Sequence, residues 1–166
     1  MNELKVWVVD DRPASLIPAR DAVKELGSQR RLEIDIRTST SFAWPPDFDD
    51  GRPPWSQDLP DIVILDLLDD EEVLRGDQFY RSLRKAEAGR GKSARAFVII
   101  WTFYLATPAV EKFASEARAT DDRLLSLERK DRIDLDTLLR KCIGRMDEEN
   151  PMLRLTEAAA QVEKNL

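Results

Sequence analysis

The chain has 166 residues, a formal net charge of −6, and a composition of 42% hydrophobic and 35% charged residues, which is typical of one globular domain. The acidic balance argues against a nucleic-acid binder. Histidine is absent and Cys142 is the single cysteine, which excludes histidine-dependent nucleophiles, zinc clusters and an internal disulfide. No apolar run is long enough to span a bilayer, and "MNELKVWVVD" lacks the layout of a signal peptide, so we expect a cytoplasmic protein without a membrane partner.

Five short segments predict β-strands. Apart from Lys5, residues 5–9, 62–65 and 97–101 are continuously apolar, as is typical of parallel strands that are covered on both faces. Residues 124–127 form a weaker run of the same kind. Residues 32–38, "LEIDIRT", alternate apolar and polar side chains, which predicts a half-buried strand near a sheet edge.

Amphipathic segments between these runs predict four helices, over residues 15–26, 77–87, from 107–108 onward, and 134–146. We expect Gly27 to cap the first helix and Pro18 to lie in its first turn. The helical spacing places Cys142 on the apolar face of the fourth helix, which indicates a buried structural thiol.

The connecting segments also carry information. The prolines of residues 42–60 predict a long loop, with Trp44 or Trp55 packed against the body, where a crossover helix would normally lie. The acidic stretch 69–72 and the basic stretch 84–95 are predicted to be solvated loops. A last helical pattern, with an a/d stripe, runs from residue 151 to 166. We therefore expect a domain over residues 1–146 and a helical extension over 147–166, which packs on its own domain, forms a homodimer contact or is a truncated linker to an effector.

Strands that alternate with helices predict an α/β fold with a doubly wound, five-stranded parallel sheet. Ligands of such sheets bind beyond the carboxyl ends of the strands. The apolar runs end there in polar groups: Asp10 and Asp11, Asp66, Thr102 and Lys130. Three carboxylates suit Mg²⁺, and a hydroxyl with an ammonium group suits a phosphoryl group. Taken alone, Asp10 and Asp11 are explained equally well as caps of the first helix.

The order of these residues resembles that of the receiver domains of two-component response regulators. "KVWVVDDRPASL", "PDIVILDLL" and "RIDLDTLLRKCI" resemble that family's opening motif, phosphoacceptor strand and final helix. The resemblance covers residues 4–146 and implies a flavodoxin-like fold. It also implies a phosphorylation-controlled signalling domain, phosphorylated by a histidine kinase or phosphotransfer protein, that acts on a downstream protein partner. Such a domain is not an enzyme beyond its own phosphorylation and dephosphorylation.

The resemblance assigns roles to individual residues. Asp66 would accept the phosphoryl group, and Thr102 and Lys130 would contact phosphoryl oxygens. Mg²⁺ would be held by Asp10, Asp11, Asp66 and the main-chain carbonyl of Leu68.

Several departures indicate an atypical receiver. The segment "ERKDRI" lacks the Lys-Pro of the family, so either Lys130 or Arg129 fills the lysine role, and residues 124–127 offer no aromatic switch residue. An irregular loop replaces the second helix. Two alternatives follow: a pseudo-receiver that acts as a phosphorylation-independent interaction module, and a Mg²⁺-dependent phosphohydrolase on a similar sheet.

Overall fold

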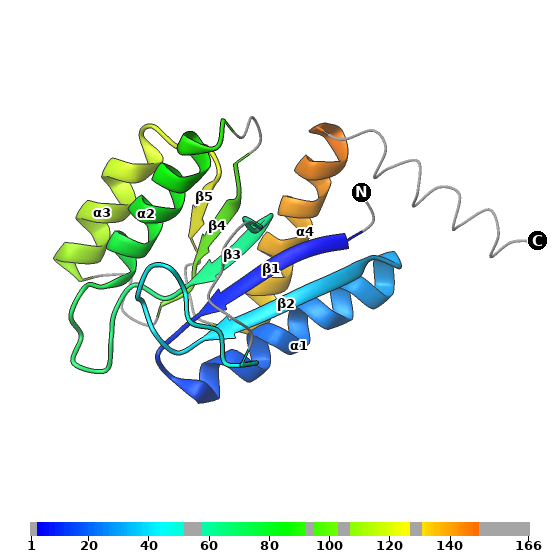
Figure 1. Cartoon of the computed structure of the whole chain (residues 1–166), viewed down its shortest axis with the longest axis horizontal. Coiled ribbons are helices and arrows are strands. Elements are labelled where there is room, and N and C mark those ends of the chain that lie inside the picture. Colours follow the sequence, from blue (N-terminus) through cyan, green and yellow to red (C-terminus); the bar gives the residue numbers. More distant parts are fainter. Residues whose placement is uncertain (1–2, 52–57, 92–94, 103–106, 127–130, 150–166) are drawn as a thin grey trace, which may run out of the picture.

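The computed structural model describes residues 3–51, 58–91, 95–102, 107–126 and 131–149. Its five strands form one parallel sheet in the order β2-β1-β3-β4-β5 (Figure 1). The strands are β1 (Glu3–Val9), β2 (Glu33–Ser39), β3 (Ile62–Leu65), β4 (Phe97–Ile100) and β5 (Leu124–Ser126). The predicted doubly wound α/β sheet is therefore confirmed, and the alternating strand β2 lies at an edge, as expected.

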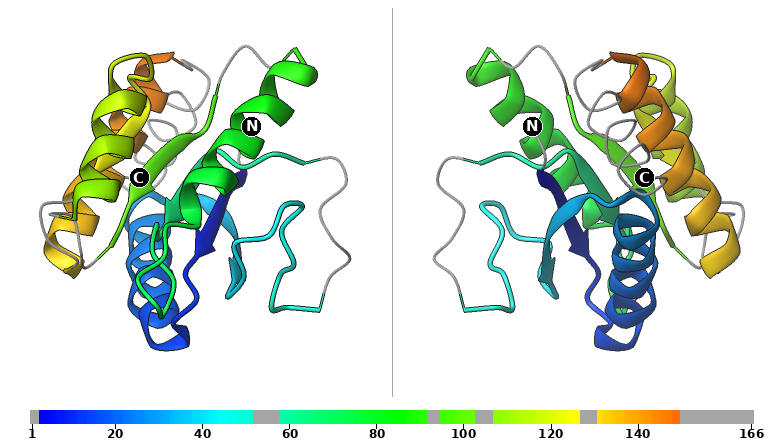
Figure 2. Two further views of the ribbon diagram at one scale, coloured as in Figure 1. Left: turned by 90° about the vertical axis from the view of Figure 1, so that its left-hand side faces the viewer. Right: turned by 90° about the vertical axis from the view of Figure 1, so that its right-hand side faces the viewer.

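Two helices cover each face of the sheet, and the side views of Figure 2 show helices on both sides of the twisted sheet. The helices are α1 (Pro13–Arg30), α2 (Gly76–Gly89), α3 (Pro108–Arg118) and α4 (Arg132–Glu149). Successive strand side chains point to opposite faces. Val6 and Val8 of β1 therefore pack in the core beneath α1 and α4, while Trp7 and Val9 pack in the core beneath α2 and α3.

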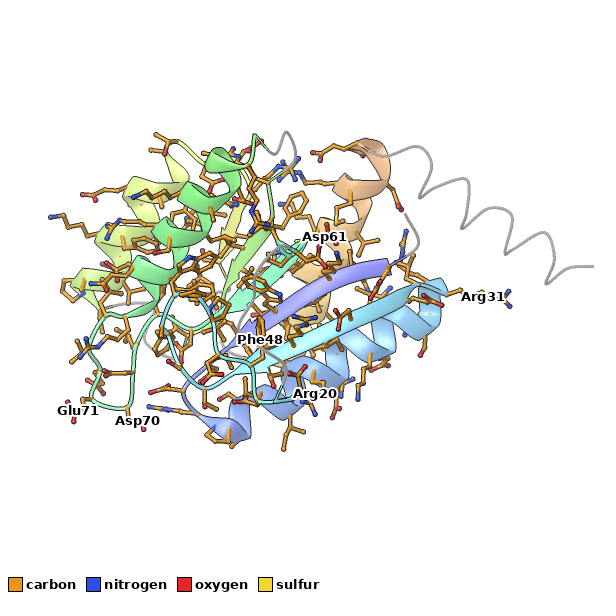
Figure 3. All side chains as sticks on the ribbon, viewed as in Figure 1. Arg20, Arg31, Phe48, Asp61, Asp70 and Glu71 are labelled. Carbon is orange, nitrogen blue, oxygen red and sulfur yellow. The ribbon has the colours of Figure 1, made fainter. Side chains whose placement is uncertain are left out.

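The loop after β2 packs against the α2 side of the sheet. Phe48 is buried and lies 5.2 Å from Trp7 between ring centroids, and Trp44 lies 5.3 Å from Phe79. Figure 3 shows Phe48 in front of the sheet. The predicted loop with Trp44 against the body is confirmed, whereas Trp55 lies outside the described residues.

The first helix is longer than predicted, and two details of that prediction are wrong. Gly27 lies inside α1 rather than at its cap; a Cβ there would come within 2.4 Å of the Ile34 side chain, so this glycine lets α1 approach β2. The capping position, with φ of 54°, belongs to Arg31. Pro13 occupies the first turn, and Pro18 lies further along the helix.

Further predictions concerned the basic stretch, the single cysteine and the tail. Helix α2 continues to Gly89, so the basic stretch 84–95 is in part helical rather than a loop. Cys142 is fully buried, and burial raises the pKa of its thiol to about 12, which confirms an inert structural cysteine. The tail pattern at 151–166 lies outside the described residues. Within the described residues, no helix combines the length and apolarity needed to cross a bilayer.

Candidate functional site

The carboxyl ends of β1 and β3 bring three of the predicted site residues together. Val9 pairs with Leu65 in the parallel register, so the next residues, Asp10 and Asp66, leave the sheet side by side. The Asp66 N–H donates to the Val9 carbonyl at 2.9 Å. Carboxylate oxygens of Asp10, Asp11 and Asp66 all lie within 4.8 Å of one another.

Main-chain donors orient two of these carboxylates. Asp10 Oδ1 accepts the N–H of Arg12 at 2.9 Å, a turn just before helix α1. Asp66 Oδ1 accepts the N–H groups of Leu67 and Leu68, at 2.8 and 3.4 Å. Asp10 thus stabilises the entry into α1, but its hydrogen bond does not exclude a second role toward a cation.

The Asp11 carboxylate is the unsatisfied member of the cluster. Burial raises its pKa, the charges of Asp70 and Asp66 raise it further, and the Asp70 N–H and the Arg12 charge offset part of that rise. Its Oδ1 is buried without a hydrogen-bond partner in the part of the chain that the structure describes. A buried carboxylate oxygen of this kind is costly unless a cation or donor reaches it.

Thr102 supplies an unsatisfied polar group at the same edge of the sheet. The Trp101 N–H donates to the Leu65 carbonyl at 2.9 Å, which places Thr102 just past the end of the strand beside Asp66. Thr102 is 1% exposed, and its hydroxyl has no hydrogen-bond partner among the described residues. The site therefore holds buried ligating groups of both kinds, carboxylate and hydroxyl.

Comparison with known proteins identifies the fold. No protein-family model and no curated protein matches the chain. A CheY-like response regulator receiver domain protein from Methanospirillum hungatei JF-1 superposes with a TM-score of 0.53 at 18% identity, over 89% of this chain and 98% of that one. The chemotaxis response regulator CheY4 of Vibrio cholerae gives 0.50 at 15% identity, over 84% and 98%. The chain has the receiver-domain fold.

The structure describes only some of the other residues and segments predicted for the site. Leu68 is buried and pairs with Leu74 in an isolated antiparallel bridge, two residues after Asp66. Lys130 and Arg129 lie outside the described residues, so the lysine role stays a prediction. Residues 40–51 and 58–61, between β2 and β3, contain no helix, which agrees with the expected loss of the second helix from this part of the chain.

The acidic stretch 69–72 is mostly exposed, as predicted, but it is also ordered by its own hydrogen bonds, within a short hairpin over residues 68–74 that the Leu68–Leu74 bridge closes. Asp69 Oδ1 accepts the N–H groups of Glu71 and Val73, each at 2.9 Å, and its Oδ2 pairs with Arg75 at 3.2 Å. These contacts lower the pKa of Asp69, the bond from Val73 most of all. The hairpin lies beside the carboxylate cluster, because its Asp70 acts on the Asp11 carboxylate.

Two charged residues that the sequence did not predict as part of the site also lie at the cluster: Arg12, which follows Asp11, and Asp70 of the hairpin. Asp70 pairs with Arg12, with Nε and Oδ1 3.5 Å apart, beside the three carboxylates. The one sequence signal was a basic and an acidic residue that each follow a strand-end aspartate. That signal is weak, because charged residues are common in such loops.

Proposed function

We propose that this protein is a phosphorylation-controlled signalling receiver, in which Asp66 accepts a phosphoryl group from a histidine kinase or phosphotransfer protein. The observation that carries the proposal is a pair of buried oxygens, just past the carboxyl ends of β1 and β4, that have no hydrogen-bond partner among the described residues: Oδ1 of Asp11 and the hydroxyl of Thr102. An acidic cluster alone would be weak support. A buried hydroxyl that lacks a partner indicates a ligand that accepts a hydrogen bond.

The donor set fits Mg²⁺, which prefers carboxylate and carbonyl oxygens. Asp10, Asp11 and Asp66 would hold the ion, together with the main-chain carbonyl of Leu68. When bound, the ion supplies the positive charge that offsets the carboxylates and the phosphoryl oxygens. The pKa of Asp11 is raised for a related reason, because burial and neighbouring negative charge both disfavour its ionised form in the absence of a cation.

The chain's own residues would prepare the transfer. The Leu67 and Leu68 N–H groups orient the Asp66 carboxylate by donating to its Oδ1. A bond forms between a carboxylate oxygen of Asp66 and phosphorus while the phosphorus–nitrogen bond of a phosphohistidine donor breaks, and the electron pair stays on the donor imidazole. The Thr102 hydroxyl would then donate to a phosphoryl oxygen, and Lys130 or Arg129 would pair with another.

The added charge would change the surface that this site presents to a downstream protein. The chain would therefore act through a protein contact and would not turn over a metabolite. Its limited chemistry would be its own phosphorylation and dephosphorylation.

The test is labelling with acetyl phosphate and Mg²⁺, read by intact mass. Wild-type protein should gain one phosphoryl group, and chelation of Mg²⁺ should prevent this. Asp66→Asn should abolish labelling, whereas Asp21→Asn, which removes the same charge from an exposed position on α1, should not. A folded wild type that gains no mass would favour the pseudo-receiver instead, and continuous release of phosphate would favour the phosphohydrolase.

A further inference from the structure

Arg12 places a positive charge at the mouth of the carboxylate cluster. Its main-chain N–H is fixed by Asp10 Oδ1 at 2.9 Å, and its side chain lies close enough to Asp11 to lower the pKa of that carboxyl. Its guanidinium Nε is 3.5 Å from Oδ1 of Asp70, at the tip of the hairpin that Figure 3 labels. Arg12 therefore links the segment that carries Asp10 and Asp11 to the hairpin that follows Asp66.

The Arg12–Asp70 pair is weak enough to exchange. The side chains are 35% and 74% exposed, and exposed ion pairs contribute only about 0–1 kcal/mol. A phosphoryl group offers arginine two oxygens in a geometry that matches its planar fork, and such charge-assisted hydrogen bonds are stronger. The guanidinium thus has a better partner available once a phosphoryl group is present.

The charge balance of the site favours that exchange. Phosphorylation removes the single charge of the Asp66 carboxylate and adds a phosphoryl group of about −2, so the site becomes more negative. Among the described residues, Arg12 is the cation that acts on the Asp11 carboxylate. A shift of Arg12 from Asp70 to the phosphoryl oxygens would offset the added charge without new folding.

We propose that Arg12 is a further phosphoryl-binding residue and that Asp70 competes for it before the phosphoryl group arrives. This inference rests on the proposed function, because it assigns a second cation to the same phosphoryl group. It also links phosphorylation to the hairpin. Asp69 fixes the shape of the hairpin by accepting the Glu71 and Val73 N–H groups. When the Arg12 side chain leaves Asp70 for the phosphoryl group, the contacts of Asp70 at the tip therefore change without unfolding of the hairpin.

The two partners of this ion pair should give opposite effects, which distinguishes the proposal from a structural salt bridge. Removal of Arg12 removes a phosphoryl ligand, whereas removal of the Asp70 charge removes a competitor for that ligand. If the pair only stabilised the loop, both substitutions would act in the same direction. Arg12→Lys keeps the charge but loses the fork, so its effect should be intermediate.

The measurement is calorimetric binding of beryllofluoride, a noncovalent phosphoryl mimic, to the full chain with Mg²⁺. We expect Arg12→Ala to weaken binding about 10-fold, the equivalent of about 1.4 kcal/mol, and Asp70→Asn to tighten it about 3-fold. Glu71→Gln removes a neighbouring charge from the same hairpin, and Arg140→Ala removes an exposed arginine from α4. Both controls should stay within about 2-fold of wild type.

Each outcome decides one claim. Unchanged affinity in a folded Arg12→Ala protein, or weaker binding in Asp70→Asn, would overturn the role of Arg12 while the proposed function stands. Failure of the wild type itself to bind beryllofluoride would overturn the proposed function and this inference together. Melting temperatures of all variants, measured without ligand, establish that the binding changes do not come from unfolding.

Discussion

The main-chain oxygen of Asp66 lies where a side chain on Gly76 would have to go. A Cβ at Gly76 would come within 2.2 Å of that oxygen and 2.9 Å of the Leu67 Cα. The N–H groups of Arg75 and Gly76 both donate to the Leu67 carbonyl, at 2.8 and 3.0 Å. The start of α2 is thus packed directly on the chain segment that carries the proposed phosphoacceptor.

We predict opposite effects for two glycine substitutions. Gly76→Ala should destabilise the protein by about 1–3 kcal/mol or more, because backbone atoms must move to admit the methyl group. Gly144→Ala should stabilise it by about 0.5–1 kcal/mol, because Gly144 lies within α4 and a Cβ there meets nothing within 4 Å. Urea unfolding of both variants tests this, and an unperturbed Gly76→Ala protein would contradict the packing described here.

At the scale of elements, a buried ionic network joins α2 to the chain segments that precede β4 and β5. Arg84 lies 2.7 Å from Oε1 of Glu87 and 2.9 Å from Oδ2 of Asp121, and Tyr80 donates to the same Asp121 oxygen. Glu87 also accepts the N–H of Ala96, just before β4, at 2.6 Å. Burial alone would raise the pKa of Asp121, but the Tyr80 hydroxyl and the Arg84 charge outweigh it and lower that pKa.

Removal of Arg84 should therefore be costly. Arg84→Met leaves Glu87, which is 0% exposed, without this cation, and leaves Asp121, which is 3% exposed, with the longer ion pair to Arg95 at 3.8 Å. We expect a loss of about 3–5 kcal/mol. Arg81→Ala, which breaks the exposed pair with Asp77 on the same helix, should cost less than about 1 kcal/mol. The measurement is urea unfolding at pH 7. Equal costs for the two variants would show that the buried network contributes little to the stability of the fold.

At the scale of the whole molecule, the parallel sheet concentrates negative charge at one edge of an already acidic protein. The pKa of Asp11 is raised above its ordinary 3.8, first by burial and then by Asp70 and Asp66. For an acid with a raised folded-state pKa, the stability penalty is absent below 3.8 and fully present above the raised pKa. The unliganded fold therefore carries an electrostatic cost at neutral pH.

Mg²⁺ and the substitution Asp11→Asn should both relieve that cost, but not additively. We expect Mg²⁺ to raise the melting temperature of the wild type at pH 7, because it binds the folded chain by mass action. Asp11→Asn should be more stable than wild type without metal at pH 7, should lose this advantage as the pH falls toward 3.8, and should respond little to Mg²⁺. Thermal scans across pH, with and without Mg²⁺, test this. If Mg²⁺ leaves the melting temperature of the wild type unchanged, the proposed metal site is wrong.

Much of this architecture could be predicted from the sequence because it depends on local periodicity. Continuous apolar runs specify buried parallel strands, and alternation specifies the edge strand β2. Since parallel strands end at the same edge, the residues that follow those runs had to meet there, which predicted the cluster of Asp10, Asp11 and Asp66. The apolar face of α4 likewise predicted the buried Cys142.

Other features depend on contacts between distant segments, and only the tertiary structure decides them. Gly27 reads as a helix cap until Ile34 of β2 is placed against it. Arg84 reads as part of a basic loop until Asp121 and Glu87 surround it. Asp70 reads as one charge of a solvated loop until the hairpin places it against Arg12. The periodicity of a segment determines which face is buried, but the partner of a charged or glycine residue is determined by how the segments pack.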